Sequence, residues 1–141
     1  MDTQSPHTSP LAGKRVLVVD DSRPLAALIQ EILTACGANV QTAHSGTHAV
    51  SRVSFDDYDL LLLDLVMPDL SGWKVLEFIA ATQPELIGKT ILLTGDRHNP
   101  GTCTAIRDQH LPVIYKPFDL DKLRKAAESR VARTLTDAGV A

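Results

Sequence analysis

The chain has 141 residues, of which 44% are hydrophobic and 22% charged, so it can bury one ordinary core and is not a disordered chain. Its net charge of −3 offers no broad positive surface, and no direct nucleic-acid partner is expected. No apolar run approaches the roughly 18 residues of a membrane span, and the N-terminus lacks the apolar stretch of a secretory signal, so we expect a cytoplasmic protein without a membrane span.

Short apolar runs alternate with helical patterns along most of the chain. Residues 1–12 are rich in Ser, Thr and Pro and are expected to form a flexible leader or linker. The domain is expected over 13–135, with a short tail at 136–141. The runs typical of buried parallel strands are 15–19, 38–43, 60–63, 90–93 and 112–115.

Helices are predicted between and after these strands. Ser22 and Pro24 begin the first helix, which Gly37 ends. Its expected buried stripe is Leu25, Leu28, Ile29, Ile32 and Leu33. The other helices are expected at 46–53, from Ser71, at 102–108 and from Asp119. This alternation predicts an α/β fold in which helices cover both faces of a five-stranded parallel sheet.

Polar side chains follow four of the predicted strands. Asp20 and Asp21 follow the first strand, Asp64 the third, Thr94 the fourth and Lys116 the fifth. Since the carboxyl ends of parallel strands form one edge, where ligands bind in such folds, all five side chains are expected to converge.

The chemistry of this set points to phosphoryl transfer. Three close carboxylates repel one another, so either one is protonated or a cation neutralises them. A few hard oxygen donors suit Mg²⁺, which keeps several waters and takes further contacts from phosphoryl oxygens. Lys116 and Thr94 are suited to bind the other phosphoryl oxygens, and Asp64 is the natural nucleophile.

Four motifs resemble the receiver domains of bacterial two-component response regulators. They are VLVVDDS (16–22), LLLLDLVMPDLSGW (60–73), LLTGD (92–96) and YKPFDLDKL (115–123), in the family's order and spacing. The resemblance covers residues 14–133. It implies a flavodoxin-like, doubly wound sheet with strand order 2-1-3-4-5 and five helices, an order that periodicity alone does not provide.

The resemblance also implies roles for the polar residues. Asp64 would accept a phosphoryl group from the phosphohistidine of a histidine kinase or a histidine phosphotransfer protein. Mg²⁺, for which Mn²⁺ could substitute, would be bound by Asp21, by Asp64 and by the backbone carbonyl of Val66, with Asp20 acting through a metal-bound water.

The resemblance assigns phosphoryl binding and switching to residues that follow the fourth and fifth predicted strands. Thr94 and Lys116 would contact the phosphoryl oxygens, Gly95 matches a small residue beside the group, and a cis peptide bond is implied between Lys116 and Pro117.

The sequence departs from the family at two places. Val113 stands where the family often has a switch aromatic, three positions before the lysine. Tyr115 faces the same side of that strand, and we hypothesise that it partly substitutes as the switch aromatic, or that the aromatic part of the switch is absent. Val66 is apolar where many relatives are polar, which predicts slower loss of phosphate.

Several functional alternatives stay open. The chain is expected to be a signalling domain that is not an enzyme beyond its own phosphoryl transfer and dephosphorylation, and its protein target would bind at about 102–133. It could equally be the receiver of a hybrid sensor histidine kinase. A haloacid dehalogenase-type phosphatase would need an acid where Val66 stands, and an FMN phosphate would be repelled by Asp20 and Asp21.

Overall fold

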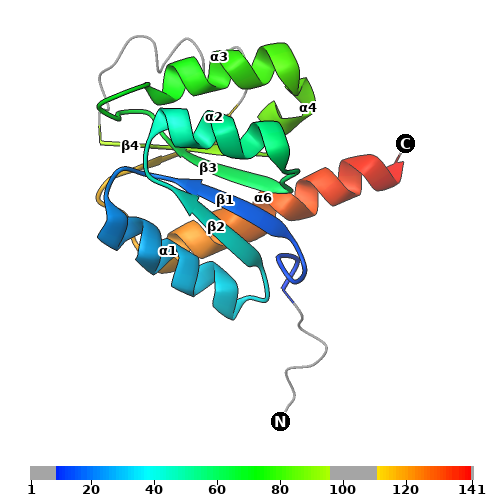
Figure 1. The fold of residues 1–141 in the computed structure, drawn as a ribbon. Helices are drawn as coiled ribbons and strands as arrows, with labels where there is room; N and C mark the ends of the chain where they lie inside the picture. Colours follow the sequence, from blue (N-terminus) through cyan, green and yellow to red (C-terminus); the bar gives the residue numbers. More distant parts are fainter. Residues whose placement is uncertain (1–8, 96–110, 141) are drawn as a thin grey trace.

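The computed structural model describes residues 9–95 and 111–140, with side chains up to residue 133. Its single sheet consists of β1 (Arg15–Val19), β2 (Asn39–Ala43), β3 (Leu60–Asp64), β4 (Thr90–Thr94) and β5 (Val113–Tyr115). All neighbouring strands are parallel and their order is β2-β1-β3-β4-β5, which confirms the expected topology (Figure 1).

The helices cover both faces of the sheet. On one face lie α1 (Arg23–Ala35) and α6 (Leu120–Val140); on the other lie α2 (Gly46–Phe55), α3 (Gly72–Thr82) and α4 (Pro84–Ile87) (Figure 1). The sequence did not predict α4, whose 4 residues are too few to show a period. The helix expected at 102–108 lies outside the described residues. No helix in the described ranges is long and apolar enough to span a membrane.

Each central strand contributes to two separate apolar layers. Val16 and Val18 of β1 belong to the cluster beneath α1 and α6, whereas Leu17 and Val19 belong to the cluster beneath α2, α3 and α4. The leucines of β3 alternate in the same way and are fully buried. Burial on both faces explains why these strands are apolar throughout.

The buried stripe of α1 differs from the prediction at two positions, since Ala26 is buried and Leu28 is exposed. Ala26, Ile29 and Leu33 are the buried residues of the helix, while Leu28 is 47% exposed. Successive helix residues are about 100° apart, so Leu28 lies a quarter-turn from Ile29 and off the side that meets the sheet. The start of α1 is as expected, because the Ser22 side chain accepts a hydrogen bond from the Leu25 N–H.

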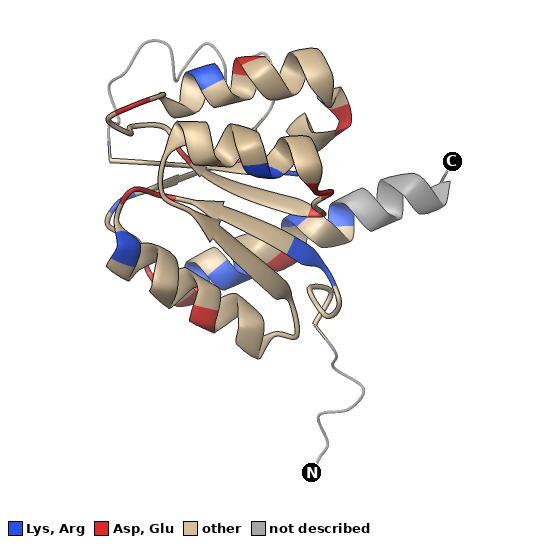
Figure 2. Ribbon diagram, in the orientation of Figure 1, with Lys and Arg blue, Asp and Glu red and all other residues tan. Residues whose placement is uncertain are grey.

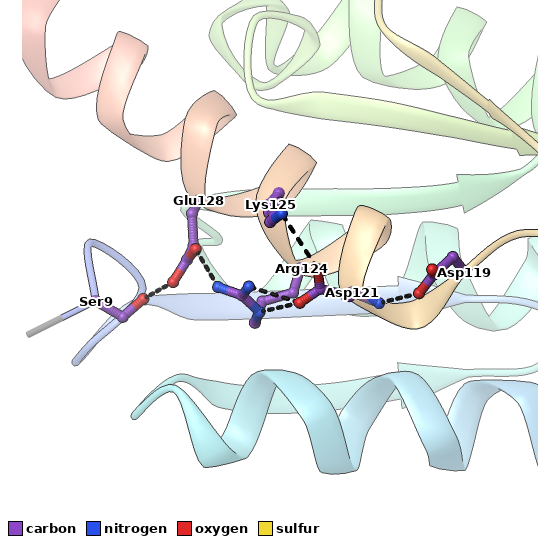
Figure 3. A network of polar contacts seen from close by, with 6 residues as sticks. All are labelled: Ser9, Asp119, Asp121, Arg124, Lys125 and Glu128. Atoms are coloured by element: carbon purple, nitrogen blue, oxygen red, sulfur yellow. Dashed lines mark hydrogen bonds and ion pairs between the residues drawn. The ribbon is translucent and has the colours of Figure 1, made fainter.

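The expectation of a flexible leader is wrong for residues 9–12, which pack on the domain. Leu11 is fully buried in the cluster beneath α1 and α6. The Ser9 hydroxyl donates a hydrogen bond of 2.7 Å to Glu128 of α6, and the Leu11 N–H donates to Ser9 Oγ (Figure 3). Arg124 donates to the other oxygen of Glu128 and thereby joins this contact to a chain of ion pairs along α6 (Figure 3).

The other end of the domain also differs from its expected boundary. Residue 135 was the expected end, but α6 continues to Val140. The predicted inner side of this helix is confirmed, since Leu123, Ala127 and Val131 are all buried.

Candidate phosphoryl-accepting site

Three carboxylates meet at the carboxyl edge of the sheet. Asp20 directly follows β1, Asp21 comes next, and Asp64 is the last residue of β3. One oxygen from each lies within 4.8 Å of the other two. Acidic ribbon is visible where β1 and β3 end (Figure 2). Asp20 and Asp64 are buried and Asp21 is exposed, so the cluster opens to solvent on the Asp21 side.

Lys116 supplies the positive charge of the cluster. Its Nζ lies 2.8 Å from Asp20 Oδ2 and 3.3 Å from Asp64 Oδ2. The backbone of the strand end holds this residue in place, because the Lys116 N–H donates to the Thr94 carbonyl at 2.8 Å. The peptide bond between Lys116 and Pro117 is cis, as the family resemblance implies.

The backbone of Asp64 lies so close to position 72 that only glycine fits there. The Val66 N–H donates to Asp64 Oδ1 at 3.0 Å. A Cβ atom on Gly72, at the start of α3, would lie 2.4 Å from the Asp64 carbonyl oxygen, so this position requires glycine. Asp64 is thus held by the loop that follows it as well as by the sheet.

The carboxyl group of Asp64 is in an environment that disfavours its charge. Burial is the largest effect and raises the pKa of Asp64 to about 6. The hydrogen bond from the Val66 N–H lowers this pKa, the charge of Asp20 raises it, and Lys116 lowers it. Burial lowers the pKa of Lys116, but the hydrogen bond and charge of Asp20, together with those of Asp64, outweigh it and the pKa is raised. One ammonium is therefore paired with the two buried carboxyl groups of a three-carboxylate cluster.

The donor set fits a hard divalent cation. Asp20 Oδ2 is buried, and the Lys116 ammonium at 2.8 Å is its one close polar partner among the described residues. One carboxylate oxygen of each residue lies within 4.8 Å of the other two, so the three side chains are close enough to share one cation directly or through a water. All the available ligand atoms are oxygens, which Mg²⁺ prefers.

The remaining predicted residues lie around this cluster. Thr94 is buried at the end of β4, and Gly95 follows it in an exposed position where, of the described residues, a Cβ atom would meet the Lys116 Cβ alone, at 4.0 Å. The Val66 side chain is 60% exposed. Tyr115 is half-buried and lines a surface pocket of about 290 Å³ that Lys122 also lines.

The sequence did not single out Asp69, although the structure ties it closely to this region. It lies in the loop after Asp64 and accepts hydrogen bonds from the first residues of α2. Those partners are more than 20 positions earlier in the chain, so no local pattern marks the contact.

Comparisons with known proteins agree with this geometry. Residues 16–128 match the family described as the response regulator receiver domain. The C4-dicarboxylate transport transcriptional regulatory protein DctD of Rhizobium meliloti is 33% identical over 123 residues, which cover 84% of this chain and 26% of that protein. The transcriptional regulatory protein TcrA of Mycobacterium tuberculosis is 32% identical over 114 residues, covering 80% of this chain and 44% of that protein. The chain spans between a quarter and a half of the length of these relatives.

Solved structures show the same fold. A CheY-like receiver domain protein from Methanospirillum hungatei superimposes with a TM-score of 0.81 at 22% identity, covering 89% of this chain and 99% of that one. The response regulator TrrA of Thermotoga maritima, solved in complex with Mg(2+)-BeF, gives a TM-score of 0.72 at 31% identity and covers 83% of this chain and 98% of its own. These matches favour a receiver over a phosphatase or an FMN-binding protein. The chain belongs to the receiver domain family of two-component response regulators.

Proposed function

We propose that this receiver takes a phosphoryl group onto Asp64 from the phosphohistidine of a histidine kinase or a histidine phosphotransfer protein. The observation that carries the proposal is the buried Asp64 carboxylate, which shares one cluster with two further carboxylates and lies 3.3 Å from the Lys116 ammonium. A carboxylate oxygen of Asp64 attacks phosphorus and forms a P–O bond. The P–N bond to the donor imidazole breaks, and the imidazole nitrogen keeps the electron pair.

The neighbouring residues bind the cation and the transferred group. Mg²⁺, or Mn²⁺ in its place, would be held by Asp21, Asp64 and the Val66 carbonyl, with Asp20 acting through a water. When bound, the cation neutralises carboxylate charge and the charge that develops on the phosphoryl oxygens. Lys116 and the Thr94 hydroxyl contact those oxygens, and the exposed Gly95 leaves room beside them.

Phosphorylation would change which groups Lys116 binds. Its ammonium now lies beside Asp20 and Asp64, and a phosphoryl group on Asp64 offers it new oxygens. A change in these contacts supplies the difference in free energy that a two-state switch requires. We assign Tyr115 as the switch aromatic and place the protein-binding surface at about 102–133, of which residues 111–133 belong to β5, α6 and the chain before and between them.

The chain corresponds to the receiver portion of a longer regulator or of a hybrid sensor kinase, or to a separate phosphorelay protein. The sequence predicted that the domain extends from residue 13 to residue 135. We now propose that it extends from residue 9 to residue 140, because Leu11 is part of the core and α6 continues to Val140.

Intact-protein mass spectrometry after incubation with acetyl phosphate tests the proposal. We expect one added phosphoryl group on the wild type that requires Mg²⁺ and is absent from Asp64→Asn. The exposed Asp57 provides a matched control, since Asp57→Asn removes one carboxylate outside the cluster and is expected to leave the adduct intact. An adduct that persists in Asp64→Asn, or no adduct with either acetyl phosphate or a phosphohistidine donor, would overturn the proposal.

A further inference from the structure

The loop between β3 and α3, residues 65–71, carries the backbone that contacts Asp64. Its first residues are tied to the sheet: the Leu65 N–H donates to the Leu93 carbonyl at 3.0 Å, and the Val66 N–H donates to Asp64 Oδ1. The Gly72 N–H, just past the loop, donates back to the Leu65 carbonyl at 3.1 Å. The loop is therefore anchored where it leaves β3 and where it enters α3.

A third anchor joins the middle of the loop to a different helix. Asp69 Oδ1 accepts a hydrogen bond from the Gly46 N–H at 3.1 Å. Asp69 Oδ2 accepts from the Thr47 N–H at 3.0 Å and from the Thr47 hydroxyl at 2.7 Å. Both oxygens of one carboxylate are thus used at the start of α2, and hydrogen bonds to an ionised acceptor are stronger than neutral ones.

The approach of the loop to α2 depends on the absence of a side chain. A Cβ atom on Gly46 would lie 2.0 Å from the Leu70 carbonyl oxygen and 2.6 Å from the Leu70 Cβ. These contacts are with backbone and Cβ atoms, which have no rotamer by which to move aside. The sequence therefore permits the loop to lie directly against the first turn of α2.

Asp69 also completes the cap of α2. The first N–H groups of a helix have no partner within it. In α2 the third of these, from His48, is satisfied by the Ser45 hydroxyl oxygen at 3.1 Å, and the Ala49 N–H bonds the Ser45 carbonyl. The first two, from Gly46 and Thr47, are satisfied by the Asp69 carboxylate, their one acceptor in the described part of the chain. The hydroxyl and N–H of Thr47 lower the pKa of Asp69, which therefore remains a carboxylate at this positive end of the helix.

We propose that Asp69 is a positioning residue, which by binding the start of α2 holds the β3–α3 loop, and with it the Val66 backbone, at the Asp20–Asp21–Asp64 cluster. The proposal rests on the proposed function as far as the metal is concerned, because the Val66 carbonyl is an expected ligand. It extends that function by naming a residue three positions beyond Val66 that touches neither the metal ligands nor the reacting atoms.

Two alanine variants separate positioning from helix capping. Asp69→Ala and Ser45→Ala each remove hydrogen bonds from the first turn of α2, but only the bonds to Asp69 join that turn to the β3–α3 loop. Amide hydrogen exchange at Val66, measured by NMR in metal-free protein, reports the position of the loop. Binding of Mn²⁺ alone, measured by electron paramagnetic resonance, reports the cluster. Asp69→Asn keeps one acceptor oxygen and serves as the conservative variant.

For Asp69→Ala we expect faster exchange at Val66 and Mn²⁺ binding weakened by about tenfold, the size typical of groups that support metal ligands. Ser45→Ala should match the wild type in both measurements, and Asp69→Asn should fall between. Wild-type exchange at Val66 in Asp69→Ala, unchanged Mn²⁺ affinity in that variant, or an equal effect of Ser45→Ala would each overturn the proposal. If the wild type itself binds no Mn²⁺, the metal part of the proposed function fails, while the exchange at Val66 still decides whether Asp69 holds the loop.

Discussion

Replacing Asp64 by Asn is expected to stabilise the metal-free protein at neutral pH. Burial raises the pKa of Asp64 from 3.8 to about 6, so its charged form is disfavoured in the folded state. For an acid whose folded pKa is raised, the destabilisation is fully present above the folded pKa, declines as the pH falls below it, and disappears below the unfolded pKa. Linkage gives a destabilisation of about 3 kcal/mol at pH 7.5, roughly half of that at pH 5 and less than about 1 kcal/mol at pH 4. Asn has the same shape and retains an oxygen for the Val66 N–H.

Urea unfolding in EDTA at these three pH values measures the effect. The free energy of unfolding of Asp64→Asn should exceed that of the wild type by up to 3 kcal/mol at pH 7.5, and the gap should shrink steadily towards pH 4. Carboxyl groups outside the Asp20–Asp21–Asp64 cluster titrate in both proteins and cancel in the difference, and Asp57→Asn should stay within about 0.5 kcal/mol of the wild type. A variant that is less stable than the wild type at pH 7.5 in EDTA, or a gap that does not depend on pH, would refute the reasoning.

Three further substitutions test other parts of the structure. Leu11→Ala should lower the free energy of unfolding by about 2–4 kcal/mol because Leu11 is fully buried. Leu28→Ala, at a half-exposed leucine, should lower it by less than about 1 kcal/mol. Equal losses of the two variants in chemical denaturation would contradict the packing of residues 9–12. Lys116→Met should lower the free energy of unfolding in EDTA by about 3 kcal/mol, because it leaves the buried Asp20 without its ion-pair partner. Mg²⁺ should restore part of this stability, and a loss that Mg²⁺ leaves unchanged would argue against cation binding at this cluster. Val66→Asn should shorten the lifetime of the phosphorylated protein, followed by loss of the phosphoryl mass, and equal lifetimes would remove the role assigned to the apolar side chain.

The sheet and its polar edge were predictable because both depend on features close together in the sequence. Strands buried on both faces are short apolar runs, as in β1 and β3, and their ends are marked by the first charged residue, here Asp20 and Asp64. Parallel strands place those ends along one edge, so the meeting of Asp20, Asp21 and Asp64 followed from the topology. The order of the strands did not follow, since it required the resemblance to the receiver family.

The features that escaped prediction depend on contacts between distant residues. Leu11 stands in a segment whose composition is typical of a linker, and only the space beneath α1 and α6 makes it part of the core. Asp69 resembles an ordinary loop residue until α2 is placed beside it. The exposure of Leu28 reflects which side of α1 meets the sheet, a direction that the apolar pattern leaves uncertain by a quarter-turn.

The carboxyl edge combines residues that lower the stability of the domain with residues that hold them in place. Asp20 and Asp64 are buried with one ammonium between them, and the raised pKa of Asp64 shows that this charge is incompletely compensated. A fold under selection for stability alone would gain from Asn at position 64. The Val66 N–H, the close contact at Gly72 and the Asp69 contacts with α2 instead maintain the cluster in its unfavourable form. Under the proposed function, free energy that is unfavourable in the metal-free protein would be recovered on cation binding, so the arrangement that weakens the fold would increase the affinity for the cation.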